Sequence, residues 1–344
     1  MKTSGARNDK ATKTRESKPA PDPDILLVSR HIVPQPGGSA VVYDALARAL
    51  EGRMMVLSAR HDASSGRPFA GLAAFDADLG YPIVRIDHLR PPLAGAPRRG
   101  LARLIDFALV DLPIMLRVLA AIVGIVHRRP IRTVIIGELV YGGWLVFPVR
   151  YLLGRRVVLY THGEEVADAD ASLADRLRPL FLRHAHGIIA VSRFCKSMLV
   201  SRYRLPPARI AVIENAVDAR RFAAARPDPA FADRLPGGQG PLLLAVGRLV
   251  RRKGHDRLLE ALARLPERHR DSRLLIVGDG PLAGEIDETI ERLGLAGRVR
   301  RTGPLTQDEL LAAYGHADLF VLATRTLENG DTEGFGLVFL EANA

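Results

Sequence analysis

Two glutamates near the end of the chain have a spacing that suits ligand binding. Glu333 and Glu341 stand eight positions apart, and the turn Gly334-Phe335-Gly336 follows the first of them. Glycine adopts positive φ angles and lets the backbone approach a ligand closely. The apolar run 337–340 is expected to start a helix that is buried or has one apolar face. If that helix began at Gly334 and Phe335, its first N–H groups there would bind an anion. Together with two carboxylates for hydroxyls, this arrangement suits a phosphorylated sugar; a surface loop leading into an ordinary amphipathic helix is the alternative.

A basic loop supplies candidate ligands for a diphosphate. Arg248 and Lys253 lie between a predicted buried strand, 241–246, and a predicted helix, 255–265. Ligands of parallel α/β proteins bind beyond the carboxyl ends of the strands, where this loop would lie. Arginine offers a planar fork of donors and lysine a point charge, a combination that suits diphosphate. The neighbouring Arg251 and Arg252 add to the positive field; residues that simply face solvent are the alternative.

The first half of the chain carries a second set of candidates at strand ends. Gly37 and Gly38 separate a predicted strand, 25–28, from a predicted helix, 40–50, and would let the backbone approach a phosphate or sugar. His162 follows a predicted strand, 156–160, and precedes a glycine. A plain turn and a structural histidine are the alternatives for these two positions.

The sequence predicts no metal site and no cofactor. Its only cysteine, Cys195, excludes an intramolecular disulfide and a cysteine-based zinc site. Asp168 and Asp170, an Asp-x-Asp pair, lie in a polar helical or loop stretch and not at the end of a buried strand, and they are interpreted as solvated. Positive side chains and helix N-termini would therefore have to neutralise a bound diphosphate.

Composition restricts the class of protein and of partner. With 344 residues, of which 47% are hydrophobic, the chain is long enough for two domains. The net charge of +11 favours an anionic partner, which could be a phosphate ligand, a membrane surface or nucleic acid. Aromatic residues make up only 6% and no RNA-binding motif occurs, so we expect no nucleic-acid partner. The polar N-terminus carries no secretory signal.

Alternating strands and helices on both sides of a Pro/Gly-rich stretch predict an α/β protein with two Rossmann-like β/α/β domains that face a cleft. The predicted organisation is a disordered basic tail at 1–22, a first domain at 23–225, a linker at 226–240 and a second domain at 241–344. A membrane- or RNA-seeking arm is the alternative for the tail.

One long apolar stretch, 101–126, calls for a separate interpretation. Asp106, Asp111, Pro113 and Arg117 interrupt it, so the sequence argues against a transmembrane helix. Arginines flank both ends of the stretch. It is either a core helix with solvated ends or a helix that rests on an anionic membrane face.

Three motifs of the second half together resemble one family. GRLVRRKG at 247–254, GDGP at 278–281 and EGFGLVFLE at 333–341 resemble the retaining family 4 glycosyltransferases, which have the GT-B fold. The resemblance extends over nearly all residues from Ile25 onward. It implies a hexosyltransferase-type enzyme that moves a sugar from a UDP- or GDP-sugar to a glycan, lipid-linked or other cell-envelope acceptor. We expect a cytoplasmic enzyme, and the basic first domain motivates peripheral contact with the cytoplasmic face of the membrane.

The resemblance also implies a role for each candidate residue. Arg248 and Lys253 would hold the donor diphosphate, while Glu333 would face the donor sugar. Glu341 would lie near the nucleotide ribose, and His162 near the reacting sugar. The remaining donor-binding positions would be Gly37, Gly38, Gly334, Phe335 and Gly336.

The chain stops three residues after Glu341, at Ala344. The resemblance implies a further strand, a glycine-rich nucleotide loop and a terminal helix beyond that point. We therefore expect a truncated second domain with an exposed sheet edge. A non-catalytic, truncated nucleotide-sugar-binding protein is the alternative to an active enzyme.

Overall fold

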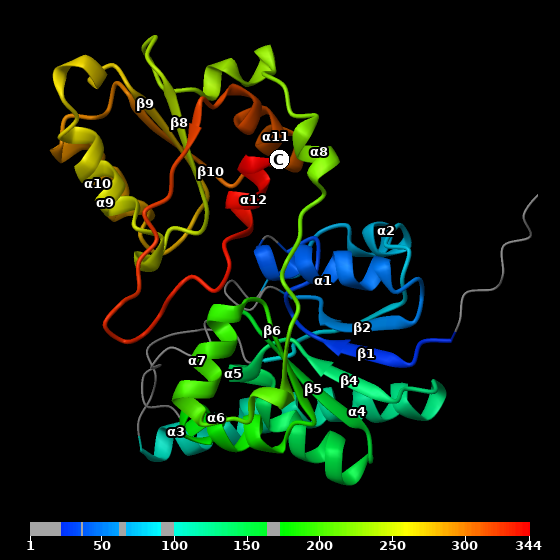
Figure 1. Cartoon of the computed structure of the whole chain (residues 1–344). Coiled ribbons are helices and arrows are strands. Elements are labelled where there is room, and N and C mark those ends of the chain that lie inside the picture. Colours follow the sequence, from blue (N-terminus) through cyan, green and yellow to red (C-terminus); the bar gives the residue numbers. More distant parts are fainter. Residues whose placement is uncertain (1–21, 36, 62–66, 91–99, 164–172) are drawn as a thin grey trace, which may run out of the picture.

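Figure 1 presents a computed structural model of the chain, which describes residues 22–344 except 36, 62–66, 91–99 and 164–172. The predicted basic tail lies outside the described residues except for its last position, Asp22. The pair Asp168 and Asp170 also lies outside them.

The first half folds around a parallel sheet with the strand order β3-β2-β1-β4-β5-β6-β7. Short runs of aliphatic residues form these strands because both faces of a parallel sheet are covered. The chain order reverses between β1 and β4, so ligands are expected beyond the carboxyl ends of these two strands. The strands are β1 (Ile25–Val28), β2 (Met54–Ala59), β3 (Ile83–Ile86), β4 (Thr133–Ile136), β5 (Arg156–Thr161), β6 (Gly187–Ala190) and β7 (Ile210–Val212).

Helices connect successive strands of this sheet (Figure 1). They are α1 (Gly38–Ala49), α2 (Leu72–Ala77), α3 (Leu101–Asp106), η1 (Phe107–Asp111), α4 (Leu112–Arg128), α5 (Leu139–Gly142), η2 (Gly143–Leu145), η3 (Pro148–Leu152), α6 (Leu173–His184), α7 (Arg193–Tyr203), η5 (Pro207–Arg209) and α8 (Ala219–Ala223).

The second half folds around a smaller parallel sheet with the order β10-β9-β8-β11. Its strands are β8 (Leu242–Val246), β9 (Arg273–Val277), β10 (Val299–Gly303) and β11 (Leu319–Phe320). Its helices are η6 (Pro229–Arg234), η7 (Arg251–Lys253), α9 (His255–Ala263), η8 (Glu267–His269), α10 (Ala283–Arg292), α11 (Gln307–His316) and α12 (Leu337–Asn343). In β11, an edge strand, Leu319 is 57% exposed. The α/β alternation predicted from the sequence is confirmed in both halves.

The last helix links the two halves. Leu337, the first residue of α12, is buried in the core of the first half, and Phe335 packs against the same core. Two further hydrophobic clusters form around the sheet of the second half. The segment before α12 therefore lies between the two sheets rather than inside one of them, as Figure 1 also shows.

The stretch α3-η1-α4 has two different apolar sides. Val118 and Ile122 of α4 are buried in the core of the first half. Leu109, Leu112 and Leu116 are exposed. Within the described residues, Phe107–Arg128 is long and apolar enough to cross a membrane by length and composition, and 28% of its most apolar window is buried. The interrupting polar residues argued against a transmembrane helix, whereas the length and composition of this helix meet the criteria for one. A single such helix is weak support for a membrane span, because core helices of soluble proteins meet the same criteria.

Candidate functional site

The candidate cation Lys253 and the candidate carboxylate Glu333 are in contact. Lys253 Nζ lies 2.6 Å from Glu333 Oε2, and the two side chains are 10% and 22% exposed. The two atoms form an ion pair without hydrogen-bond geometry. Lys253 follows β8 in the turn η7, whereas Glu333 precedes α12, so the fold joins two motifs that are 80 positions apart.

Arg252 belongs to the same cluster. Its side chain is 14% exposed and lies 3.6 Å from Asp331 and 3.8 Å from Glu333. Of the two interpretations, Arg252 fits the one in which it adds to the positive field of the site, because the loop before α12 folds back and supplies carboxylates to it. Arg251 fits the alternative, since it is an exposed residue that pairs with Glu285 across 3.0 Å.

Arg248 differs from Lys253 in its surroundings. Its side chain is exposed and makes no hydrogen bond or ion pair with another described residue. The loop that carries it is held by the GDGP motif: Leu249 donates its N–H to the carbonyl of Asp279 at 3.0 Å. Gly278, at φ +138°, approaches the carbonyl of Gly247 so closely that a side chain would collide with it. The guanidinium of Arg248 is therefore available to an anionic ligand, and the backbone of the loop that carries it is held in place.

The helix near Glu333 begins with the apolar run 337–340, as predicted, and not at the preceding glycine turn. α12 starts at Leu337 and not at Gly334, because Gly336 has a φ angle of +85° and a left-handed backbone that cannot continue a right-handed helix. Gly334, Phe335 and Gly336 form the turn before the helix. Glu333 therefore lies in the loop, and only Glu341 lies on α12.

Glu341 is tied to a neighbouring helix. Its Oε2 accepts a hydrogen bond of 2.7 Å from the hydroxyl of Tyr314 on α11. Burial raises the pKa of Glu341, while the hydrogen bond from Tyr314 and the charge of Lys253 act in the opposite direction.

The glycine loop of the first half contacts α12. A Cβ atom on Gly38 would lie 3.2 Å from Leu337 Cδ1. Gly37, at φ +139°, precedes α1, and no side chain caps the first N–H groups of that helix. These N–H groups can therefore bind an anion near the segment that follows Glu333.

Two tyrosines hold His162. The hydroxyl of Tyr43 donates to the carbonyl of Gly137 at 2.7 Å and lies 2.7 Å from His162 Nε2. Since the single hydroxyl proton goes to Gly137, Nε2 must carry a proton and donate to Tyr43. Tyr160 stacks on the imidazole with ring centroids 5.0 Å apart. Sequence reasoning missed Tyr43, whose position in an apolar helix pattern looks like that of a core residue.

Gly334 joins the two halves directly. Ser192 Oγ, at the start of α7, donates a 2.7 Å hydrogen bond to the carbonyl of Gly334. A side chain at Gly334 would collide with the carbonyl of His162, and one at Gly163 would lie 2.8 Å from the Cα of Gly334. Only glycine fits here, so this contact sets the distance between His162 and the loop that carries Glu333.

The structure thus brings together residues from three strand ends of the first half and two loops of the second. Gly38 lies next to Leu337, the backbone of His162 lies against Gly334, and Lys253 forms an ion pair with Glu333. Among the residues the structure describes, no group of three His, Cys, Asp or Glu side chains could hold a metal ion. The site offers cations and N–H groups for an anion and carboxylates for hydroxyls.

Family models match both halves of the chain. The model of Glycosyltransferase Family 4 matches residues 36–221, and that of glycosyl transferases group 1 matches residues 229–344.

Curated relatives match part of the chain. The GDP-mannose-dependent alpha-(1-6)-phosphatidylinositol monomannoside mannosyltransferase of Mycolicibacterium smegmatis is 36% identical over 195 residues, which are 55% of this chain and 50% of the relative. The 2-deoxystreptamine glucosyltransferase of Streptomyces kanamyceticus is 32% identical over 147 residues, which are 41% of this chain and 37% of the relative. The alignments thus span half the length of these relatives or less.

Solved structures share the fold over most of the chain. HepE of Anabaena in complex with UDP-glucose has a TM-score of 0.65 at 19% identity, with 92% of this chain and 77% of that chain covered. Sucrose-phosphate synthase of Thermosynechococcus elongatus has a TM-score of 0.65 at 21% identity, with 92% and 78% covered. These likenesses show that the chain has the GT-B fold.

Proposed function

This chain belongs to glycosyltransferase family 4, and we propose that it moves a sugar from a nucleotide-diphosphate sugar to a glycan or lipid-linked acceptor of the cell envelope, with retention of the anomeric configuration. A curated relative is named as dependent on GDP-mannose. GDP-mannose is therefore the first donor to test, and UDP-sugars are the second.

The observation that carries this proposal is the cluster around Glu333. Lys253 Nζ contacts Glu333 across 2.6 Å, and the turn that follows Glu333 contacts both His162 and Gly38. A nucleotide-diphosphate sugar has the matching features, because its phosphates need cations and N–H groups while its sugar hydroxyls need a carboxylate. The arrangement supports a donor whose diphosphate lies between Lys253 and the Gly37-Gly38 loop.

In the proposed reaction, the bond between the sugar and the diphosphate breaks first. Negative charge grows on the leaving phosphate, and Arg248, Lys253 and the first N–H groups of α1 stabilise it there. The acceptor hydroxyl attacks the sugar from the face that the diphosphate leaves, and the departing phosphate takes its proton. Glu333 accepts hydrogen bonds from the sugar hydroxyls and orients the ring, and it forms no covalent bond to the sugar.

We further propose that the reaction needs no metal ion. Arg248 and Lys253 carry two positive charges on one loop, and Arg252 adds a third nearby. These charges can balance the leaving diphosphate, a role that a divalent cation would otherwise take. The proposed location is the cytoplasmic face of the membrane, where nucleotide sugars and lipid-linked acceptors meet.

The test is product formation by the full chain. GDP-mannose or a UDP-sugar is mixed with a lipid extract of membranes in the presence of EDTA, and the anomeric configuration of the product is read by NMR. The expected result is an α-linked product from an α-linked donor, with the activity unaffected by EDTA. A chain that neither binds, hydrolyses nor transfers any common nucleotide sugar would disprove the proposal.

A further inference from the structure

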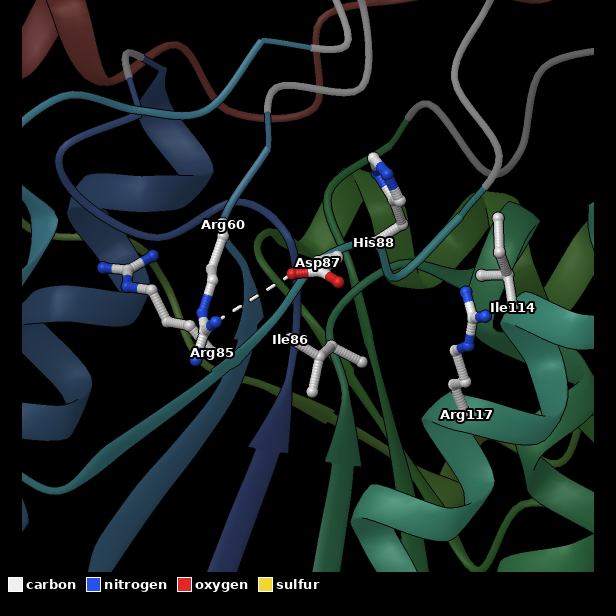
Figure 2. A pocket seen from close by; sticks show the side chains of 7 residues that line it. All are labelled: Arg60, Arg85, Ile86, Asp87, His88, Ile114 and Arg117. Carbon is white, nitrogen blue, oxygen red and sulfur yellow. Dashed lines mark ion pairs between the residues drawn. The ribbon is translucent and has the colours of Figure 1, made fainter.

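The carboxyl edge of the first sheet is occupied unevenly. At the ends of β2 and β3 lies a cavity of about 300 Å³, and the described residues that line it all belong to the first half of the chain (Figure 2). At the ends of β5 and β6, in contrast, Gly334 of the second half packs against the backbone of His162 and Gly163. The groups that hold Gly334 at this place therefore decide where the loop that carries Glu333 lies.

Neighbouring strands bring these groups together. β5 and β6 are parallel, with Thr161 opposite Ala190, so residues 162–163 and Ser192 lie side by side just past the two strand ends. Ser192 is also the N-cap of α7, because its Oγ accepts a hydrogen bond of 3.1 Å from the N–H of Cys195. The fold thus places a hydroxyl and a thiol from one helix start beside the glycine that follows His162.

Both groups donate to the same oxygen of the second half. Ser192 Oγ donates a 2.7 Å hydrogen bond to the carbonyl of Gly334, and Cys195 Sγ lies 3.5 Å from that carbonyl oxygen. A serine hydroxyl has one proton and can accept as well, so Ser192 caps α7 as an acceptor and holds Gly334 as a donor. The carbonyl oxygen has two lone pairs and can accept from the hydroxyl and, more weakly, from the thiol.

Glu333 is held from two directions. Its carboxylate lies 2.6 Å from Lys253 Nζ, and its backbone is joined to Gly334, which Ser192 holds. If a diphosphate binds Lys253, the ion pair no longer fixes the carboxylate. The hydrogen bond from Ser192 to Gly334 does not involve Lys253, so it remains when the sugar needs its carboxylate in place.

We propose that Ser192 is a positioning residue for the transfer reaction. Its hydroxyl, assisted by the thiol of Cys195, holds the carbonyl of Gly334 and thereby keeps Glu333 directed at the sugar of the bound nucleotide sugar. Ser192 acts through the backbone of Gly334 and not on the reacting atoms. This inference rests on the proposed function, because Glu333 has a sugar to orient only if the chain is a glycosyltransferase.

A helix cap without any further role is the competing explanation of Ser192, and three variants separate the two. Ser192→Asn keeps an acceptor for the cap and an N–H donor for Gly334. Ser192→Asp keeps the acceptor but has no proton to donate when it is ionised, and Ser192→Ala has neither group. Asparagine and aspartate cap helices about equally well, so these two variants differ in the hydrogen bond to Gly334 and not in the cap.

The thiol of Cys195 reports on the contact directly. Cys195 is the only cysteine of the chain and is 0% exposed, so its reaction with the thiol reagent DTNB requires Gly334 to withdraw. In the full chain without ligand, we expect Ser192→Asp and Ser192→Ala to react about tenfold faster than the wild type, and Ser192→Asn to react at the wild-type rate. Ser197→Ala is the matched control on α7, since the hydroxyl of Ser197 donates within the helix to the carbonyl of Phe194.

Kinetics with GDP-mannose test the consequence for the reaction. The kcat of Ser192→Asp and Ser192→Ala should fall about tenfold, because Glu333 no longer has a fixed position. The affinity for GDP, measured by calorimetry, should stay within about twofold of the wild type, because GDP carries no hexose for Glu333 to orient. Ser192→Asn should match the wild type in both quantities.

An equal thiol rate or an equal kcat in Ser192→Asn and Ser192→Asp would overturn the inference, because the hydrogen bond to Gly334 would then have no effect. A change confined to Ser192→Asp, with Ser192→Ala like the wild type, would show repulsion by the new charge and would also overturn it. The thiol rates need no nucleotide sugar, so they are independent of the proposed function. If the wild type binds GDP-mannose and the thiol rates are alike, only the inference about Ser192 fails; if the thiol rates differ as expected and no nucleotide sugar binds, the proposed function fails.

Discussion

Lys253 Nζ and Glu333 Oε2 are 2.6 Å apart, so the residue expected to bind the donor's diphosphate and the residue expected to bind its sugar are paired with each other. A diphosphate would give Lys253 a new anionic partner and release the carboxylate for the sugar hydroxyls. Donor binding should therefore exchange one ion pair for two separate contacts.

A double-mutant cycle measures this exchange. Lys253→Met and Glu333→Gln, alone and combined, should show a coupling of about 1–2 kcal/mol in the free energy of unfolding, because both side chains are largely buried. With saturating nucleotide sugar the coupling should fall towards zero. Glu333→Gln should also lower the rate of transfer roughly 100-fold.

The surface pair Arg251 and Glu285 serves as the control for this cycle. It comes from the same basic loop and has a contact of 3.0 Å, but both side chains are about half exposed. Its coupling should stay below about 1 kcal/mol and should not respond to the donor. A donor-independent coupling between Lys253 and Glu333 would contradict the exchange.

Arg248 and Arg252 should respond differently to truncation. The side chain of Arg248 is exposed and makes no polar contact with another described residue, so Arg248→Ala should raise the donor KM about tenfold without changing stability. Arg252 lies near Asp331 and Glu333, and Arg252→Ala should lower the free energy of unfolding by about 1–3 kcal/mol. Chemical denaturation and steady-state kinetics of both variants check this difference. Equal stability losses would contradict the assignment of Arg248 to the ligand.

Tyr43 should act on catalysis through His162. Tyr43→Phe removes the hydroxyl that accepts from His162 Nε2. We expect kcat to fall about tenfold and its pH profile to shift, with little change in the donor KM, because the imidazole loses its fixed tautomer. Tyr160→Phe keeps a ring stacked on His162 and is the matched control. A Tyr43→Phe enzyme with an unchanged pH profile would indicate a purely structural role.

Gly334 should set how closely the two halves of the chain pack against each other. In Gly334→Ala the new methyl group would collide with the carbonyl of His162, so the halves should separate and transfer should fall at least 100-fold. Small-angle scattering should then show a larger radius of gyration. Gly284→Ala, in α10 with no atom near the new methyl group, should change neither quantity. An active and equally compact Gly334→Ala variant would contradict this role.

The strands and their order along the chain were predictable because buried parallel strands are short aliphatic runs. The helical run 337–340 was predictable as well, but the sequence left open whether the glycine turn before it belongs to the helix, because glycine tolerates both the left-handed backbone seen at Gly336 and helical angles. The pairing of Arg252 with Asp331 was hidden for another reason. These residues are 79 positions apart, and only the fold brings their loops together. The contact of Tyr43 with His162 was equally unpredictable, because the pattern of the helix indicates that Tyr43 is buried but not which residue it contacts.

His255 should make the stability of the second half depend on pH. His255 is 2% exposed, and among the described residues neither ring nitrogen has a hydrogen-bond partner. Burial, together with the charge of Lys253, lowers the pKa of His255 to about 4, although the charge of Asp256 acts in the opposite direction. The unfolded chain, with an ordinary pKa near 6.5, binds a proton first as pH falls. Stability is therefore complete above about pH 6.5 and decreases down to about pH 4, by on the order of 3 kcal/mol.

His255→Leu removes the group that titrates and fills the same apolar space. Denaturation by urea at pH 7.5, 5.5 and 4.5 should show that the wild type loses stability relative to the variant as the pH falls. The difference between the two proteins should grow over this range because other acid-labile groups are common to both. A constant difference at all three values would mean that the pKa of His255 is the same in the folded and unfolded chain, and would contradict its buried, neutral state.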